Sequence, residues 1–506
     1  MELFSFLFIA LLFTFYLYFV TGKPRKTNHK GFKHYPLIGT LPEFLKNRHR
    51  FLEWSTQVLR DCPTNTAVFS RPYSYHGVIT ANPDNVEHML KTRFQNYPKG
   101  DRFIHHLQDF LGNGIFNSDS ELWKVQRKIA SHEFSTKSLR NFIVNSVTTE
   151  LQTRLLPILF LASQTNRVLD LQDLFERFAF DNVCKLAFNV DPACLGGDGT
   201  AGAEFMSAFE AAAGLSSGRF MSAFPFMWKI KKLLNIGTER RLRESITTVH
   251  VFADSIIRSR LESRDPAGDD EDLLSRFIRT KESSPEFLRD VVISFILAGR
   301  DTTSSALTWF FWILSSRPDV RRKIRDEIAR VRSATRGVGA FGYEELREMH
   351  YLHAALTEAM RLYPPVPVDS KKCLDDDVLP DGTRIGKGWF ISYHTYAMGR
   401  MESVWGKDCT LYNPDRWLEN GVYRTESPFR FPVFHAGPRM CLGKEMAYIQ
   451  MKSIAASLIK NFEIEAVDKD TCPEHVLSLT LRMKGGLTVR VRTRDTQASL
   501  HSNTGF

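Results

Sequence analysis

The chain has 506 residues, of which 43% are hydrophobic and 25% charged, as in a globular protein with a substantial core. Its formal net charge of +10 comes from cations spread along the chain without a nucleic-acid-binding module, so no nucleic-acid partner is expected. Seven cysteines without a CxxC pair argue against a disulfide framework and a zinc site. The 39 phenylalanines favour apolar walls and hence an apolar ligand.

The chain starts with an apolar run. Residues 3–20 carry no charge, and as a helix rising about 1.5 Å per residue they would extend roughly 27 Å, enough to span a bilayer core. A cleaved signal peptide is the alternative, but no basic region precedes the run and no clear small-residue cleavage site follows it. We therefore predict a transmembrane anchor over 1–22. The lysines and arginines that follow it predict a cytosolic body.

The rest of the chain reads as one body between two short polar segments. A basic, turn-rich linker covers 23–40, the body covers 41–495, and the polar tail 496–506 is expected to be disordered. No internal repeat and no strong linker divides the body.

The elements of the body predict a mainly α fold with small β-sheets. Two β-rich runs around 71–74 predict a hairpin, and Asn82 followed by Pro83 predicts a capped helix start. From about 121 to 333 the pattern is mainly helical, and strand-like stretches return near the C-terminus.

A long apolar helix is predicted in the second half of the body. Ser283 or Ser284 caps it, Pro285 occupies its first turn and Pro318 ends it, which gives about 32 residues or roughly 48 Å. Apolar residues on most of its faces predict burial.

The middle of this helix carries the polar sequence AGRDTT, which permits two interpretations. Thr302 and Thr303 can simply bond to preceding carbonyls while Asp301 pairs with an arginine. Alternatively, the hydroxyls loosen the helix into a bulge, Gly299 allows close approach, and a small molecule such as oxygen finds room. The motif is informative only in combination with others.

A later amphipathic helix places Glu358 and Arg361 three residues apart on one face. An exposed pair would contribute little, but the apolar surroundings predict burial, which requires further hydrogen bonds. Arg416 in NPDRW is a candidate to supply them, and the predicted role of the three residues is structural.

The stretch FHAGPRMCLG raises the question of what Cys441 does. A small buried hydrophobe is the commoner role of an isolated cysteine. Here, however, Gly437 and Gly443 permit a tight loop, and a helix that begins directly afterwards points its amides at the sulfur and favours a thiolate.

A single thiolate ligand with no second cysteine or histidine at ligand spacing suits a haem iron. Arg439 is a candidate partner for one haem propionate. Trp123 and Arg127, four residues apart on one helical face, are candidates for the other.

Together these motifs resemble the cytochrome P450 superfamily: WKVQR, AGRDTT, EAMR, NPDRW and FHAGPRMCLG occur in the expected order over some 320 residues. The resemblance implies the P450 fold, haem b, dioxygen, and electrons from NADPH through the flavins of NADPH-cytochrome P450 reductase. It implies Asp301 and Thr302 as catalytic residues and Cys441 as the axial iron ligand. The implied cofactor-binding residues are Cys441, Arg439, Trp123, Arg127 and Lys371.

Further stretches, among them LKTRFQNYPKGDRF, MRLYPPVPVDSK and YAMGRMESVWG, resemble the plant clan of fatty-acid ω-hydroxylases and related terminal hydroxylases of lipids. This implies an enzyme of the endoplasmic reticulum membrane that hydroxylates the ω carbon of a fatty acid or C-26 of a cholesterol-type sterol. A jasmonoyl-isoleucine hydroxylase and a non-catalytic membrane haem sensor or carrier remain alternatives. By clan position, the expected substrate-lining residues are Phe103, Phe116, Phe295, Ala298, Val366 and Val368.

Overall fold

The computed structural model describes residues 31–72, 75–133, 137–196, 202–224, 226–262, 272–280, 284–337 and 339–494. The predicted anchor, residues 23–30 of the linker and the whole polar tail 496–506 lie outside the described residues. Within the described ranges, no helix is long and apolar enough to cross a membrane.

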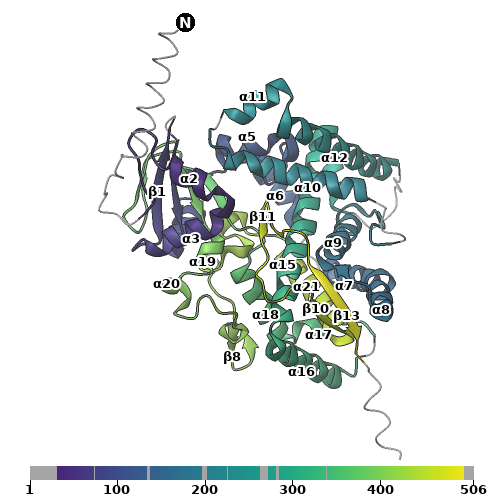
Figure 1. Cartoon of the computed structure of the whole chain (residues 1–506). Helices are drawn as coiled ribbons and strands as arrows, with labels where there is room; N and C mark the ends of the chain where they lie inside the picture. Colours follow the sequence, from purple (N-terminus) through teal and green to yellow (C-terminus); the bar gives the residue numbers. More distant parts are fainter. Residues whose placement is uncertain are drawn as a thin grey trace, which may run out of the picture. The chain divides into compact units, whose positions relative to one another are not determined.

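The chain forms two compact units, each assembled from separate stretches of sequence (Figure 1). The first combines the described residues up to Pro98 with Val368–Gly406, and the second combines Lys99–Pro367 with the chain from Lys407 onward. No linker marked this division in the sequence, because each unit is closed by a segment that returns from far along the chain.

The first unit is built on a four-stranded sheet with the order β1-β2-β7-β4. β1 (Thr66–Arg71) and β2 (Tyr75–Thr80) pair antiparallel, which confirms the predicted hairpin. β7 (Phe390–Tyr393) runs parallel to β2, and β4 (Asp369–Lys372) runs antiparallel to β7.

Short helices accompany this sheet. The side chain of Asn82 accepts a hydrogen bond from the amide of Asp84, so the predicted capped start of α4 is confirmed. The unit contains α2 (Leu41–Asn47), α3 (Phe51–Asp61), α4 (Pro83–Glu87), α19 (Thr395–Met398), α20 (Glu402–Trp405), the π-helical His88–Thr92, the 3₁₀ turns Arg48–Arg50 and Phe94–Asn96, and the pair β5 (Asp377–Val378) and β6 (Arg384–Ile385).

The second unit is mainly helical, as the sequence predicted. Its helices are α5 (Gly100–Leu111), α6 (Ser120–Glu133), α7 (Lys137–Glu150), α8 (Leu156–Thr165), α9 (Leu171–Phe188), α10 (Ala203–Gly218), α11 (Met227–Leu234), α12 (Gly237–Glu262), α13 (Leu273–Ile278), α14 (Pro285–Ile296), α15 (Thr302–Ser315), α16 (Pro318–Thr335), α17 (Tyr343–Arg347), α18 (His350–Leu362) and α21 (Lys444–Asn461). Within the second unit, α15 packs against both α9 and α18 (Figure 1).

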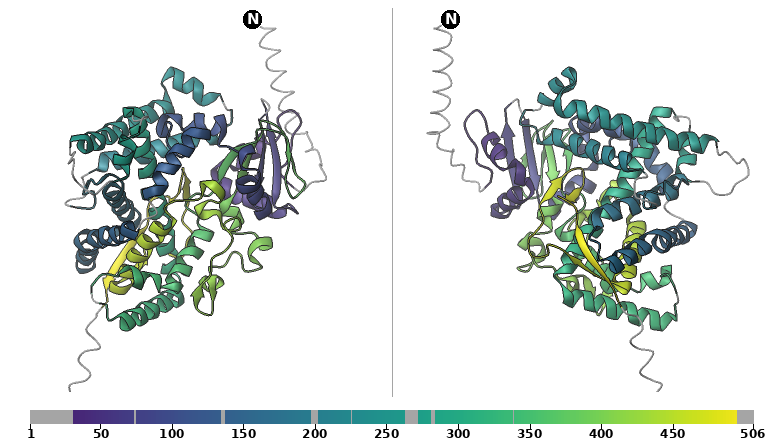
Figure 2. Two further views of the ribbon diagram at one scale, coloured as in Figure 1. Left: turned by 180° about the vertical axis from the view of Figure 1, so that it is seen from behind. Right: turned by 45° about the vertical axis from the view of Figure 1, so that its right-hand side comes forward.

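Small sheets and turns complete this unit. One of the strands, β13 (Thr488–Thr493), packs against α8, as both views of Figure 2 show. The strands are β3 (Leu169–Asp170), β8 (Leu418–Glu419), β9 (Val422–Tyr423), β10 (Phe462–Ala466), β11 (His475–Leu477), β12 (Leu481–Met483) and β13 (Thr488–Thr493). They pair as β10-β13-β3, β11-β12 and β8-β9. Single π or 3₁₀ turns occur at Leu151–Leu155, Leu297–Asp301, Arg219–Met221, Pro414–Trp417, Pro432–Phe434 and Gly437–Arg439.

The predicted long helix is confirmed, with an irregularity in its middle. The hydroxyl of Ser284 accepts from the amide of Phe287 at 3.2 Å, so Ser284 is the cap. α14 continues through a π-helical segment, Leu297–Asp301, into α15. The bulge, which belongs to the second interpretation of the AGRDTT motif, is therefore present.

Gly299 lies where α9 approaches this π-helical segment. A Cβ added to Gly299 would lie 2.6 Å from Cγ2 of Val183, well inside normal contact distance. The group that approaches the glycine backbone is therefore a valine of α9, and this close approach brings the two helices together.

Glu358 and Arg361 form a fully buried pair, joined by contacts of 2.6 and 2.7 Å. The arginine also donates to the carbonyls of Cys409 and Leu411. The carboxylate accepts from the indole N–H of Trp417 at 2.9 Å.

Two further contacts complete the acceptor side of this pair. Glu358 accepts from the amide of Asn413 at 2.9 Å, and Nε of Arg416 lies 3.4 Å from the same carboxylate. Because the charges of a buried pair lack water, these surrounding partners are what make its burial tolerable.

Replacing Trp417 by Phe removes one donor to Glu358 while keeping an aromatic ring beside Phe431. A hydrogen bond to a buried charge contributes about 1.5–3 kcal/mol, so we expect the free energy of unfolding in urea to fall by about 2 kcal/mol. Glu419→Gln is the control, since this side chain is mostly exposed and should change stability by less than about 0.5 kcal/mol. If the free energy of unfolding fell equally in the two variants, the hydrogen bond from Trp417 to the buried Glu358 would not contribute to stability.

Candidate active site

The loop around Cys441 is held by its own backbone. The amide of Cys441 donates to the carbonyl of Phe434 at 2.8 Å, closing a loop in which Gly437 has a φ of 65°. Such a φ favours glycine, which explains Gly437. α21 begins at Lys444, directly after Gly443, whose backbone N–H interacts with the sulfur.

The Cys441 side chain is exposed, yet the surrounding protein is dense enough that burial raises the pKa of its thiol. The backbone N–H of Gly443 and the charges of Arg127 and Lys444 act in the opposite direction and favour the thiolate. A sulfur that is accessible and also closely surrounded can bind a metal from one side.

Arg439 does not project freely into solvent. Its guanidinium donates to Asp119 Oδ1 at 2.6 Å and to the carbonyl of Ser118 at 3.0 Å, and it stacks over the ring of Trp123 at 4.3 Å. Asp119 also accepts from the amides of Lys99 and Gly100. This aspartate thus ties the arginine to the start of α5, a contact that the sequence did not indicate.

The chemistry of these residues fits a haem group. The thiol of Cys441 is a soft donor, and no cluster of three or more His, Cys, Asp or Glu suited to a metal ion occurs in the described part of the chain. Arg127, Arg439 and Trp123 provide two cations and an indole donor on the same unit, as two propionates require. Lys371 lies on the first unit, where its ammonium pairs with Asp369 at 2.8 Å.

The π-helical segment opens one face of an otherwise buried helix. Phe295, Asp301 and Thr303 are buried, whereas Ala298 and Thr302 are only partly buried. The latter two are four residues apart and therefore share a face.

Both interpretations of the AGRDTT motif find support in the geometry. The hydroxyl of Thr302 donates to the carbonyl of Ala298 at 2.7 Å, which leaves its oxygen able to accept a hydrogen bond. Asp301 pairs with Arg300 at 2.7 Å. Burial raises the pKa of Asp301 to about 6, against the effect of the neighbouring guanidinium.

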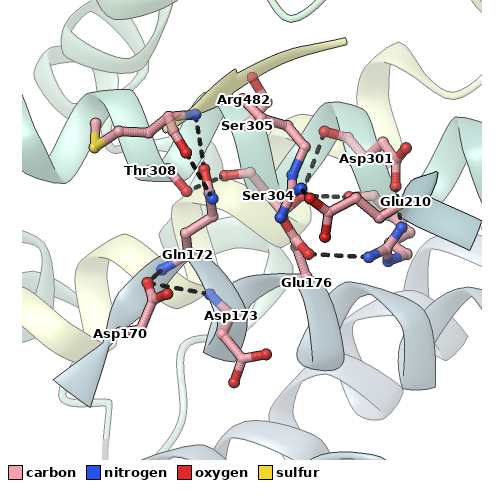
Figure 3. Close-up of polar contacts among 12 residues, drawn as sticks. Asp170, Gln172, Asp173, Glu176, Glu210, Asp301, Ser304, Ser305, Thr308 and Arg482 are labelled. Atoms are coloured by element: carbon pink, nitrogen blue, oxygen red, sulfur yellow. Dashed lines mark hydrogen bonds and ion pairs between the residues drawn. The ribbon is translucent and has the colours of Figure 1, made fainter. Parts of the chain in front are cut away.

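Sequence reasoning missed two residues close to this acid. Glu176 of α9 binds Arg300 at 2.9 Å, and Arg482 of β12 binds Glu176 at 2.7 Å (Figure 3). The available signal was a glutamate within the apolar run LFERFAF, where only an internal partner makes burial of a carboxylate tolerable.

The expected substrate-lining residues are placed differently from one another. Phe103 is partly buried against the core of the second unit, with the ammonium of Lys99 4.1 Å from its ring centre. Phe116 and Val366 are exposed on that unit, while Val368 belongs to the first unit. Their contact with a substrate stays a prediction.

The comparisons with known proteins agree with this geometry. The family model described as cytochrome P450 matches residues 30–488. The chain is 53% identical over 464 residues to cytochrome P450 CYP94D108 of Paris polyphylla, covering 91% of this chain and 92% of the relative.

Two further plant relatives are similar over almost their whole length. The chain is 48% identical over 478 residues to cytochrome P450 94B1 of Arabidopsis thaliana, covering 92% of each. It is 46% identical over 473 residues to cytochrome P450 94A1 of Vicia sativa, covering 92% of this chain and 90% of the relative. These matches confirm the resemblance to the plant clan.

Asp119→Ala would release Arg439 and remove the acceptor for two amides at the start of α5. We expect haem to be lost to excess apomyoglobin about fivefold faster, corresponding to about 1 kcal/mol, because a charge-assisted hydrogen bond and a cap disappear. The matched control is Asp101→Ala, an exposed acid in the first turn of the same helix. Equal transfer rates for both variants would show that Asp119 does not support the site.

Proposed function

The chain belongs to the cytochrome P450 family and is a haem-thiolate monooxygenase, and we propose on this basis that it hydroxylates the terminal carbon of a lipid chain. The substrate would be a fatty acid, attacked at its ω carbon, or a cholesterol-type sterol, attacked at C-26. The reaction balances as RH + O₂ + 2 electrons + 2 H⁺ → ROH + H₂O.

The observation that carries this proposal is the opened face of the central helix. Ala298 and Thr302 lie partly exposed there, and the turn that precedes them, Phe295–Leu297, is apolar and buried. A lipid chain end would therefore meet an apolar surface with one hydroxyl, which suits a substrate without polar groups near the reacting carbon. Because a terminal C–H bond is stronger than its methylene neighbours, selectivity would come from admitting only the chain end.

The residues of the chain would divide the chemistry as follows. Cys441 would hold the haem iron as a thiolate, with Arg439, Trp123 and Arg127 as the proposed partners of the propionates. When bound, the haem supplies oxygen activation and C–H oxidation. Asp301 would supply protons, and Thr302, whose own hydrogen points to Ala298, would accept a hydrogen bond from the proton-bearing group.

We further propose that the enzyme is anchored in the endoplasmic reticulum membrane by residues 1–22, with the haem domain 41–495 in the cytosol. NADPH-cytochrome P450 reductase would deliver the electrons. Arg127 and the exposed Lys128 of α6, together with Lys444, give the cysteine side of the second unit a basic character that supports docking of an acidic partner.

Thr302→Ala should uncouple electron consumption from product formation. We expect product per NADPH to fall about tenfold, while NADPH is still consumed and hydrogen peroxide accumulates. The reason is that the variant lacks the hydroxyl oxygen that would accept a hydrogen bond from the proton-bearing group. Thr308→Ala removes an equivalent hydroxyl with the same 2.7 Å bond to the carbonyl four residues earlier, and should leave coupling unchanged. Unchanged coupling in Thr302→Ala would refute its catalytic role.

A substrate panel tests the proposed activity itself. Membranes containing the enzyme and reductase are incubated with NADPH and fatty acids, jasmonoyl-isoleucine or hydroxylated cholesterols, and products are identified by mass spectrometry. We expect terminal alcohols from a fatty acid or a sterol, and none from membranes carrying Cys441→Ala. Products from jasmonoyl-isoleucine alone, or oxygen inserted only within the chain, would contradict the proposal.

A further inference from the structure

A line of alternating charges leads from the central helix to the surface of the second unit. Asp301 Oδ1 accepts from Arg300 at 2.7 Å, and the other arm of that guanidinium donates to Glu176 Oε2 at 2.9 Å. Oε1 of the same glutamate accepts from Arg482, whose far arm pairs with Glu210 (Figure 3).

Burial decreases steadily along this line. The side chains of Arg300 and Asp301 are almost fully buried, and so is that of Glu176, whereas Arg482 is 18% and Glu210 50% exposed. Arg300 and Glu176 each have an opposite charge on either side, and Asp301, at the inner end, has Arg300 as its partner; this pairing is what permits burial of three ions in the interior. The exposed acid at the end gives the line contact with solvent.

The five residues come from four elements. Asp301 and Arg300 lie on the π-helical segment, Glu176 on α9, Arg482 on β12 and Glu210 on α10. β12 is also bound to the central helix elsewhere, since the carbonyl of Leu481 accepts from the hydroxyl of Ser305 at 2.7 Å. Glu176 is therefore the one carboxylate among these contacts that joins the arginine beside the acid to the C-terminal hairpin.

We propose that Glu176 is a positioning residue for proton delivery: by dividing its charge between Arg300 and Arg482, it limits how tightly Arg300 neutralises Asp301. This inference rests on the proposed role of Asp301 as proton source. The single guanidinium of Arg300 is shared between two carboxylates, those of Asp301 and Glu176. Arg482 neutralises part of the charge of Glu176 and so determines how strongly Glu176 attracts Arg300. Neither Glu176 nor Arg482 needs to contact substrate or haem for this role.

Electrostatics gives each substitution a direction. Burial raises the pKa of Asp301 to about 6; Arg300 lowers it, and Glu176 raises it. Loss of the Glu176 charge removes a carboxylate that repels Asp301. Arg300 then pairs with Asp301 alone, so the pKa of Asp301 falls. Loss of the Arg482 charge leaves Glu176 to draw Arg300 away, so the pKa of Asp301 rises.

The test compares the pH dependence of Glu176→Gln and Arg482→Gln. Product per NADPH should decline as pH rises through the pKa of Asp301, because only the protonated acid donates. We expect the midpoint to move down by about one pH unit in Glu176→Gln and up by about half a unit in Arg482→Gln. Opposite shifts cannot arise from general loosening of the fold, and shifts in one direction would overturn the proposal.

A second readout does not depend on turnover. Infrared titration can follow the carboxyl band that disappears in Asp301→Asn, and this band should shift its midpoint in the same directions as the coupling curve. Asp173→Asn is the matched control: this acid also lies on α9 and pairs with an arginine, Arg177 at 2.9 Å, but it is half exposed and outside the line of charges. It should leave both midpoints unchanged.

The Asp301→Asn variant separates the role of Glu176 from the role of Asp301 as the proton source. If Asp301→Asn stays fully coupled, Asp301 is not the proton source, and both ideas fall. If Asp301→Asn uncouples but Glu176→Gln and Arg482→Gln keep the midpoint of the original enzyme, only the positioning role is refuted. Should Glu176→Gln not accumulate as folded protein, the upward shift in Arg482→Gln, at a more exposed position, decides alone.

Discussion

The buried pair of Glu358 and Arg361 is the constraint on which the cysteine side of the second unit depends. Two charges without access to water require a complete set of partners, and the chain supplies them from the segment between Cys409 and Trp417. α18 and this segment are therefore fixed to one another. Neither could move without leaving a charge unpaired in the interior.

This fixed region continues toward the cysteine loop through aromatic contacts. Trp417, which donates to Glu358, packs on Phe431 with ring centres 4.9 Å apart. On the other side, His353 of α18 stacks on Tyr448 of α21 at 3.9 Å, and Tyr448 contacts Phe434 at 5.3 Å. The carbonyl of Phe434 accepts a hydrogen bond from the amide of Cys441. The buried pair of Glu358 and Arg361 and the sulfur therefore belong to one packed region.

The sequence predicted the elements that local chemistry determines. Residue types and spacing predicted a cap at Ser283 or Ser284 and burial of the Glu358 pair, and a bulge was one of two interpretations of the AGRDTT motif; the cap at Ser284, the bulge after Ile296 and the buried pair are all present. The pairing of Glu176 with Arg300 was not predictable, because 124 positions separate the two residues and only the packing of α9 on the central helix brings them together.

The attachment of Arg439 to Asp119 was hidden for the same reason. The two residues are 320 positions apart, and nothing in FHAGPRMCLG indicates which acid meets the arginine. The split of the body into two units likewise depends on segments that return from a distance. Sequence motifs thus predicted the candidate reacting groups, while the charged residues that surround them could be found only from the fold.

The central claim is that Cys441 holds a haem iron as a thiolate. The most direct measurement is the absorption spectrum of the reduced carbon-monoxide complex, recorded for the enzyme and for Cys441→His with equal haem content. We expect the red-shifted band of a thiolate-ligated haem in the enzyme and its replacement by the band of an imidazole-ligated haem in the variant. Persistence of the thiolate band in Cys441→His would contradict it, because another sulfur would then have to be the ligand.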